Sequence, residues 1–342
     1  MEYIREGRVL KDGSTIDCSR RLGILSAEQF QKVLKRFDCG AYIKAEPIPH
    51  GLFGQNVFVT STTGQYVLRG KPHSIWQFPK ERFFCDEIKK QTRVPVPHPY
   101  RIDESPEIFG WPYVLMPRMP GKFIHDPATS KTLTIEDRTA IAAAMGETLA
   151  ELHNCRWPHC GEYEFCSNSV KPLELPFSKW VLYHIRKTLD NCAAWPDYSP
   201  AADIEQVWRD VEQAAPAMAV PFQPCLVMHD FREGNANHDY LGGRWQVTGL
   251  FDLMECFAGD GEMDLSRQAA DYILLDRKAA AVFVRSYAAK RPPRPLFNAR
   301  FGLYMLADRL GIWDYGIQHA WFKKGETLRE WLQQFLGLEQ LL

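Results

Sequence analysis

The chain of 342 residues lacks several features that would place it in common classes of protein. Its 41 basic and 42 acidic residues give a formal net charge of −1, so it has no basic excess to attract nucleic acid or an anionic membrane. No apolar run approaches the roughly 18–20 residues that span a bilayer. The first residues, MEYIREGRVLKDG, contain no apolar segment like that of a signal peptide. We therefore expect a soluble protein that needs no nucleic acid, membrane or obligate protein partner.

The cysteines also lack the patterns of disulfide frameworks and zinc sites. There are nine of them, an odd number, spread widely and without a CxxC pair. This usage is typical of reduced thiols, and we expect a cytoplasmic location. The GxxxxGK pattern is absent too, which disfavours a P-loop nucleotide site.

The length and the periodicity predict two lobes. A chain of this size exceeds the usual extent of one hydrophobic core. From about Ala45 to Leu68 the pattern favours strands with short turns between them, and WPYVLMPRMPG follows as an apolar strand. Most of the remaining chain has helical spacing. We expect an α+β fold with a β-rich lobe over residues 1–117 and a mostly helical lobe over residues 118–342.

The most informative stretch runs from Leu226 to Asp252, LVMHDFREGNANHDYLGGRWQVTGLFD. A hairpin that turns at Gly242-Gly243 would bring Asp252 beside Asn235 and near Asp230. An enzyme that transfers a phosphoryl group needs one carboxylate for the substrate alcohol and oxygen ligands for Mg²⁺. We interpret Asp230 as the base and the other two residues as the metal ligands, which predicts a kinase of small molecules.

Two glycines in the expected sheet are candidates for contact with phosphates. Gly51 and Gly54 lie in a turn between strands, where a residue without a Cβ permits close approach of the backbone. An ordinary hairpin turn is the alternative.

Six segments in order resemble the aminoglycoside phosphotransferase family (APH/choline kinase-like). They are YVLRG, MPRMPG, LAELH, HDFREGN, GLFDLMECFAGD and GDGEMDLSR. The likeness extends from about residue 28 to the C-terminus and is greatest to the hygromycin-kinase-like branch. It implies a bilobal fold related to protein kinases, with ATP or GTP as phosphate donor and Mg²⁺ as cofactor.

The resemblance also implies roles on the nucleotide side. Arg69 stands where protein kinases have a lysine on the phosphate-contacting strand. Glu81 is the expected partner of Arg69, and Glu87 is the competing choice. The hinge, Met116-Pro117-Arg118-Met119, is expected to bind adenine through backbone groups, and because Pro117 has no N–H, Arg118 or Met119 is the expected donor.

The substrate side is less defined. The family places histidine two residues before the catalytic aspartate, where this chain has Met228, and His229 is adjacent to Asp230. Candidate substrate-binding residues are His229, Glu255, Asp271 and Asp308. We also expect Asp264 to cap a helix that begins at Leu265 and Asp260 to brace the metal-binding segment.

Three functions follow from these patterns. The first is an O-phosphotransferase that modifies an aminoglycoside or a related antibiotic, and thereby confers resistance. The second has the same chemistry with a metabolite as substrate, such as an amino alcohol, a sugar or an amino acid. The third is a nucleotide-binding pseudokinase.

Overall fold

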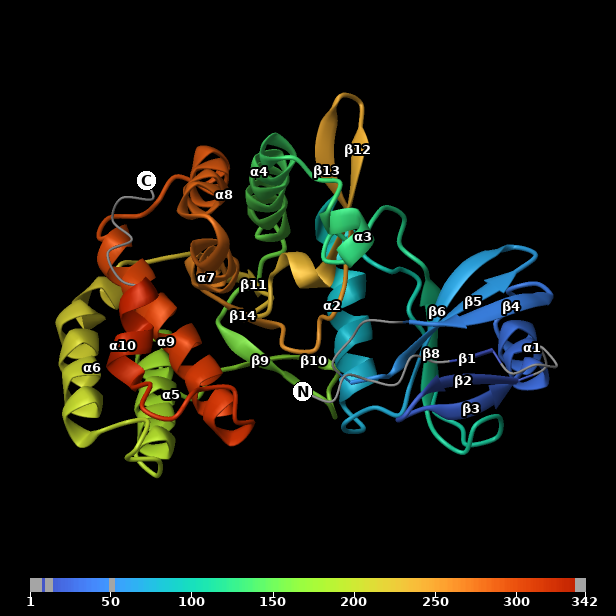
Figure 1. Cartoon of the computed structure of the whole chain (residues 1–342), viewed down its shortest axis with the longest axis horizontal. Coiled ribbons are helices and arrows are strands. Elements are labelled where there is room, and N and C mark those ends of the chain that lie inside the picture. The colour runs from blue at the N-terminus through green and yellow to red at the C-terminus, as the bar shows by residue number, and fades with distance from the viewer. Residues whose placement is uncertain (1–7, 10–14, 49–52, 336–342) are drawn as a thin grey trace.

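The computed structural model describes residues 8–9, 15–48 and 53–335, which form two lobes side by side (Figure 1). The first lobe is built on a five-stranded antiparallel sheet in the order β4-β5-β6-β8-β7. Its strands are β4 (Tyr42–Pro47), β5 (Asn56–Ser61), β6 (Gly64–Gly70), β7 (Arg101–Asp103) and β8 (Tyr113–Pro117). Every second residue of β5 is buried, because alternate side chains of a strand point to the same face. These strands confirm the period-two pattern of the sequence.

A second, three-stranded sheet and two helices complete this lobe. The sheet consists of β1 (Arg8–Val9), β2 (Thr15–Ser19) and β3 (Gly23–Ser26), and the sequence analysis did not predict it. Helix α1 (Ala27–Arg36) begins at Ser26, which forms a capping box with Gln29. Helix α2 (Gln77–Gln91) stands between the sheet and the second lobe (Figure 1). It ends where the proline-rich segment VPVPHP makes further helix unfavourable.

The second lobe is mostly helical, as predicted. Its helices are α3 (Pro127–Ser130), α4 (Ile135–Leu152), α5 (Phe177–Cys192), α6 (Ala201–Ala214), α7 (Leu265–Leu275), α8 (Arg277–Lys290), α9 (Phe297–Gln318) and α10 (Leu328–Leu332). A four-stranded antiparallel sheet has the order β10-β9-β14-β11. These strands are β9 (Gly161–Glu164), β10 (Ser169–Pro172), β11 (Cys225–Val227) and β14 (Phe257–Gly259). The predicted hairpin is present as β12 (Ala236–Leu241) and β13 (Arg244–Leu250). The molecule is therefore an α+β protein with two lobes.

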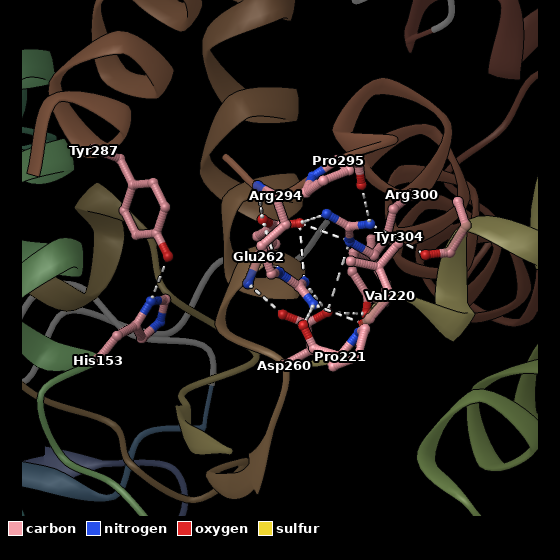
Figure 2. A network of polar contacts seen from close by, with 11 residues as sticks. His153, Val220, Pro221, Asp260, Glu262, Tyr287, Arg294, Pro295, Arg300 and Tyr304 are labelled. Atoms are coloured by element: carbon pink, nitrogen blue, oxygen red, sulfur yellow. Dashed lines mark hydrogen bonds and ion pairs between the residues drawn. The ribbon is translucent and has the colours of Figure 1, made fainter. Parts of the chain in front are cut away.

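A buried ion network includes Asp260, which directly follows β14 in the chain (Figure 2). The carboxylates of Asp260 and Glu262 both pair with Arg294, and Glu262 also pairs with Arg300 at 2.7 Å. The hydroxyl of Tyr304 donates to Asp260 at 2.6 Å. We expected Asp260 to brace the metal-binding segment, but its side chain instead ties the end of β14 to α9 and to the loop before it.

The larger of two hydrophobic cores continues from the second lobe into the first. It includes Phe84 and Ile88 of α2 together with Val114 and Met116 of β8. Packing that crosses the lobe boundary fixes the two lobes against each other, so residues from both can form one site. No helix in the described part of the chain is long and apolar enough to cross a membrane.

Candidate active site

The loop after β11 holds Asp230 and Asn235 together. A 3₁₀ turn, Glu233–Asn235, directs the Asn235 side chain back, and its Nδ2 donates to the Asp230 backbone carbonyl at 2.9 Å and to Oδ2 at 2.8 Å. This leaves Asn235 Oδ1 without a hydrogen bond within the described residues. The asparagine therefore fixes the aspartate and keeps one free oxygen.

Asp252 joins them from the other end of the hairpin. The backbone N–H of Phe251 donates to the Asn235 carbonyl at 3.0 Å, which places the two hairpin ends side by side. Asp252 has a φ of +68°, a left-handed conformation that aspartate tolerates better than most residues. Its Oδ1 accepts from Arg69 Nη2 at 3.4 Å. The structure thus brings together the three residues singled out in the sequence.

The loop that carries Asp230 is anchored by Asp264, a role that the sequence did not suggest. We expected its carboxylate to cap α7, but it makes no such hydrogen bond. Instead it accepts from the backbone N–H of Met228 at 2.6 Å and of His229 at 2.7 Å. His153, at the end of α4, lies 3.4 Å from the same carboxylate and 2.9 Å from the Tyr287 hydroxyl (Figure 2). The two N–H contacts hold His229 in its left-handed backbone conformation, φ +65°.

Asp230 lies in a largely desolvated environment. Burial raises the pKa of its carboxyl group above the ordinary value, and the positive charge of Arg267 opposes that rise. Arg267 Nη1 is 3.5 Å from Asp230 Oδ1, while its Nε donates to Asp308 at 2.7 Å. A carboxylate whose pKa is raised is a stronger base, which suits proton abstraction from an alcohol.

Arg69 and Glu81 form a buried ion pair, as the family resemblance implied. Arg69 Nη1 donates to Glu81 Oε2 at 2.9 Å. Glu81 also accepts from Tyr100 at 2.6 Å and from Gln77 at 2.9 Å, so both of its oxygens are bonded. Burial lowers the pKa of Arg69, but the charges of Glu81 and Asp252 outweigh this and the net shift is upward. Glu87, the competing candidate, contacts Lys90 and Gln91 instead.

The residues present fit a bound nucleotide phosphate and a magnesium ion. Arg69 Nε is buried without a hydrogen-bond acceptor among the described residues, and an anionic oxygen would satisfy it. The free oxygen of Asn235 and the carboxylate of Asp252 are the ligand types that Mg²⁺ prefers. In the described part of the chain, no three His, Cys, Asp or Glu side chains are grouped to hold a metal. Mg²⁺ commonly completes its coordination with phosphate oxygens and water, so two protein ligands suffice.

The two candidate donors of the hinge, the backbone N–H groups of Arg118 and Met119, differ in their hydrogen bonds. The backbone N–H of Arg118 donates to the Gln65 carbonyl at 3.0 Å, and its guanidinium lies over the Phe58 ring at 3.8 Å. The Met119 carbonyl accepts from Asn237 at 3.1 Å, but its N–H has no acceptor within the described residues. Met119 is therefore the better placed donor for adenine.

Of the two glycines, Gly51 lies outside the described residues. Gly54 has a φ of +58°, and a Cβ there would lie 3.2 Å from the Ser19 side chain. Glycine is favoured at this position by its backbone conformation and by close packing against the second sheet. Contact of Gly54 with phosphate stays a prediction.

A cavity of about 610 Å³ opens beside the loop that carries Asp230. His229 and Arg267, two neighbours of Asp230, form part of its wall, and Glu255 and Asp308 also line it. Asp308 is already paired with Arg267 and Arg309. Further lining comes from Trp76, Lys80, Glu162, Tyr163, Phe165, Trp180, His184 and Phe257. Asp271, the fourth candidate for substrate binding, does not line the cavity and pairs with Arg232 at 3.2 Å.

Several residues of the site were not identified from the sequence. Arg267 is one of them, although its position three residues after Asp264 gives it the same helix face. Tyr100 reaches Glu81 from beyond a proline-rich loop, and no spacing rule connects the two. Lys80, Trp76 and Trp180 are far apart in the chain, and only the tertiary fold brings them into the lining of one cavity.

Comparisons with known proteins identify the fold and the family. Solved structures with the same fold include an aminoglycoside phosphotransferase APH(4)-Ia in complex with ADP and hygromycin B. That structure is 16% identical with a TM-score of 0.61, over 86% of this chain and 93% of the other. The GDP complex of aminoglycoside 2'-phosphotransferase-IIIa is 14% identical with a TM-score of 0.58, over 92% and 96%. These identities show the fold alone, and they do not single out the hygromycin-kinase-like branch.

Curated relatives match a shorter stretch. The homoserine kinase of Methylobacillus glycogenes is 30% identical over 135 residues, which is 38% of each chain. That of Methylobacillus flagellatus is 29% identical over 133 residues, again 38% of each. The chain thus matches well under half the length of these relatives. The model of the phosphotransferase enzyme family (APH) matches residues 44–296, which is more than half of the chain. The chain therefore belongs to the phosphotransferase enzyme family.

Proposed function

We propose that this protein transfers the γ-phosphoryl group of ATP or GTP to a hydroxyl group of a small molecule, with Mg²⁺ as cofactor. The observation that carries the proposal is the convergence of Asp230, Asn235 and Asp252 on one side with the buried pair Arg69–Glu81 on the other. Structural neighbours crystallised with ADP or GDP support a nucleotide donor.

Each side chain has a definite part in this chemistry. Asp230 orients the substrate hydroxyl and accepts its proton, helped by a pKa that burial raises. Arg69 places its charge and its unpaired Nε–H toward the phosphates, and Glu81 keeps it in that position. Asn235 and Asp252 would hold Mg²⁺, which when bound neutralises charge on the phosphate oxygens. Phosphoryl transfer relies on positioning and electrostatics, and here these groups are already oriented by hydrogen bonds.

The cavity favours a substrate with few charges over a polycation. An aminoglycoside carries several ammonium groups and needs a concentrated acidic surface. Here Asp308, an acidic residue of the cavity lining, is offset by its ion pairs with Arg267 and Arg309. Lys80 adds positive charge beside Glu162 and Glu255. A metabolite alcohol such as an amino alcohol, a sugar or an amino acid fits this balance better, and the partial likeness to homoserine kinases supports it.

An aminoglycoside or related antibiotic is the second candidate. It is supported by structural neighbours in complex with hygromycin B or kanamycin. A resistance kinase of this kind would use the same residues for phosphoryl transfer. The two proposals therefore differ only in the substrate that is phosphorylated.

A substrate panel tests the proposal. Mg²⁺-dependent transfer from ATP and from GTP would be measured with homoserine, amino alcohols, sugars, aminoglycosides and tuberactinomycins, for the wild type and for Asp230→Ala. We expect turnover of a metabolite that the variant loses. Turnover of an antibiotic instead would establish the second candidate. Nucleotide binding without transfer to any compound would leave the protein a pseudokinase and contradict the proposal.

A further inference from the structure

The turn between β2 and β3 carries an arginine to the edge of the expected phosphate site. Arg21 Nη2 donates to the backbone carbonyl of Lys71 at 2.5 Å, and Lys71 Nζ donates to the carbonyl of Arg21 at 2.6 Å. Lys71 follows directly on β6, two residues after Arg69. The segment matched by the family model begins only at residue 44, so Arg21 belongs to a part of the chain outside that match.

A chain of three hydrogen bonds connects Arg21 to Arg69 through the Lys71 carbonyl and the Gln55 side chain. The Lys71 carbonyl that accepts from Arg21 also accepts from Gln55 Nε2 at 2.7 Å. Gln55 Oε1 in turn accepts from Arg69 Nη2 at 3.4 Å. Nearby, Ser19 Oγ donates to the Gly54 carbonyl at 2.5 Å, which attaches β2 to the glycine turn. The second sheet is thus bonded to the residues that would surround the phosphates.

Three basic side chains, Arg21, Arg69 and Lys71, lie near one another at this edge of the expected phosphate site, and only Arg69 has carboxylate partners. Arg21 and Lys71 form no ion pair with an acidic side chain among the described residues, whereas Arg69 has Glu81 and Asp252. Burial and the charge of Arg69 lower the pKa of Arg21, which shows that the two guanidinium groups influence each other. Placing like charges together is unfavourable unless an anion joins them.

Arg21 also keeps hydrogen-bond donors available. A guanidinium group has five N–H donors. The contacts of Arg21 within the described residues are the Lys71 carbonyl and, at 3.4 Å, Nδ1 of His73. The side chain is partly exposed, so its remaining donors are accessible to an oxyanion.

We propose that Arg21 is part of the nucleotide site and that, together with Arg69, it binds the triphosphate tail. The second sheet then contributes to substrate binding and not only to the stability of the lobe. Guanidinium groups form strong charge-assisted hydrogen bonds with phosphate oxygens. The inference rests on the nucleotide site of the proposed function and adds a phosphate-binding residue to it.

Calorimetric titration of the full chain with ATP, AMP and adenosine, in the presence of Mg²⁺ and without a phosphate acceptor, tests this. The variants are Arg21→Gln and, as matched control, Arg20→Gln, which removes the same charge from the exposed neighbour. We expect Arg21→Gln to weaken ATP binding about tenfold, the loss of one charge-assisted hydrogen bond. Binding of adenosine should be unchanged, and Arg20→Gln should bind all three ligands like the wild type.

A purely structural role predicts a different pattern. If Arg21 only holds β2 and β3 against β6, Arg21→Gln would lower the melting temperature and weaken ATP and adenosine equally, which would overturn the inference. Unchanged ATP binding would overturn it too, while leaving the proposed function intact. Failure of the wild type to bind ATP would contradict both. Arg21→Lys keeps the charge, so it should retain part of the ATP affinity even if the glutamine variant folds poorly.

Discussion

The phosphate side and the substrate side of the site differ in how their charges are balanced. Glu81 is buried and both of its oxygens accept hydrogen bonds, from Arg69, Gln77 and Tyr100. Across the site, Lys80, Glu162 and Glu255 line the cavity and form no ion pair with any described residue. The side chains of the first region are held in place before any ligand binds, so this region is called the organised side. In the second region, the charges of Lys80, Glu162 and Glu255 are available to bind a ligand. We infer that the groups for phosphoryl transfer are held in fixed positions by hydrogen bonds. The substrate is selected by a few accessible charged groups in the cavity.

The largest effect is expected from changing Asp252, a proposed metal ligand on the organised side. Asp252→Asn keeps the shape of the side chain and a residue type that tolerates a positive φ. Because metal-ion charge stabilisation is worth several kcal/mol, we expect kcat/KM to fall about 10²–10³-fold. The measurement is a Mg²⁺ titration of phosphoryl transfer, with Asp239→Asn on the same hairpin as control. An unchanged Mg²⁺ dependence would exclude Asp252 as a ligand.

The next effect concerns the buried pair of Arg69 and Glu81. Glu81→Gln leaves Arg69 buried with Asp252 as its remaining carboxylate partner. Loss of one partner of a buried pair typically costs about 3 kcal/mol in the free energy of unfolding, and ATP affinity should fall as Arg69 loses its position. Glu87→Gln on the same helix is the control. Denaturant unfolding and ATP titration would read out both effects, and equal behaviour of the two variants would contradict the assignment.

The third effect is a dependence of folding stability on pH, caused by a buried histidine in the β12–β13 hairpin. His238 is fully buried, its ring nitrogens have no partner within the described residues, and burial, with a smaller contribution from His125, lowers its pKa to about 3. The unfolded chain binds a proton near pH 6.5, but the folded chain does not until the pH is much lower. Stability should therefore fall as the pH drops below about 6.5, by about 2 kcal/mol at pH 5 from this residue.

Replacing the residue tests the assignment to His238. The variant His238→Gln should lose about 2 kcal/mol less than the wild type between pH 7 and pH 5, as measured by urea unfolding at the two pH values. An identical drop in both proteins would mean that other groups are responsible.

The smallest effect is expected in the cavity. Glu255→Gln should leave the KM for ATP unchanged and alter the KM for the substrate a few-fold, in the range of a partly exposed charge contact of about 1 kcal/mol. The direction is informative, because an ammonium-bearing substrate would bind more weakly and a carboxylate-bearing one more tightly. A change in the KM for ATP of the same size would contradict the separation of the two regions.

Much of the organised side could be predicted from the sequence because its residues lie close along the chain. Asn235 is five residues from Asp230, and the hairpin signalled by Gly242-Gly243 returns the chain to Asp252. In this case local periodicity and turn residues determine the neighbours. The pairing of Arg69 with Glu81 was expected from the family resemblance and not from a local pattern.

The remaining features depend on contacts that local patterns do not encode. Asp264 stands where a helix cap is expected, yet its carboxylate is drawn to two unpaired backbone N–H groups from a distant loop. The second sheet arises from short segments without a clear period. The cavity combines side chains from α2, α5, α7 and α9. Such contacts require the tertiary fold, so the substrate could not be deduced from charge counts along the chain.

We propose that Asp230 promotes transfer of a phosphoryl group from a nucleotide that the rest of the site holds. Rapid-quench measurement of a single turnover, with enzyme in excess over labelled ATP and saturating Mg²⁺ and substrate, tests it most directly. For Asp230→Ala we predict unchanged ATP binding and a transfer rate about 10²–10⁴-fold lower. A variant that transfers phosphate at the wild-type rate would contradict the account.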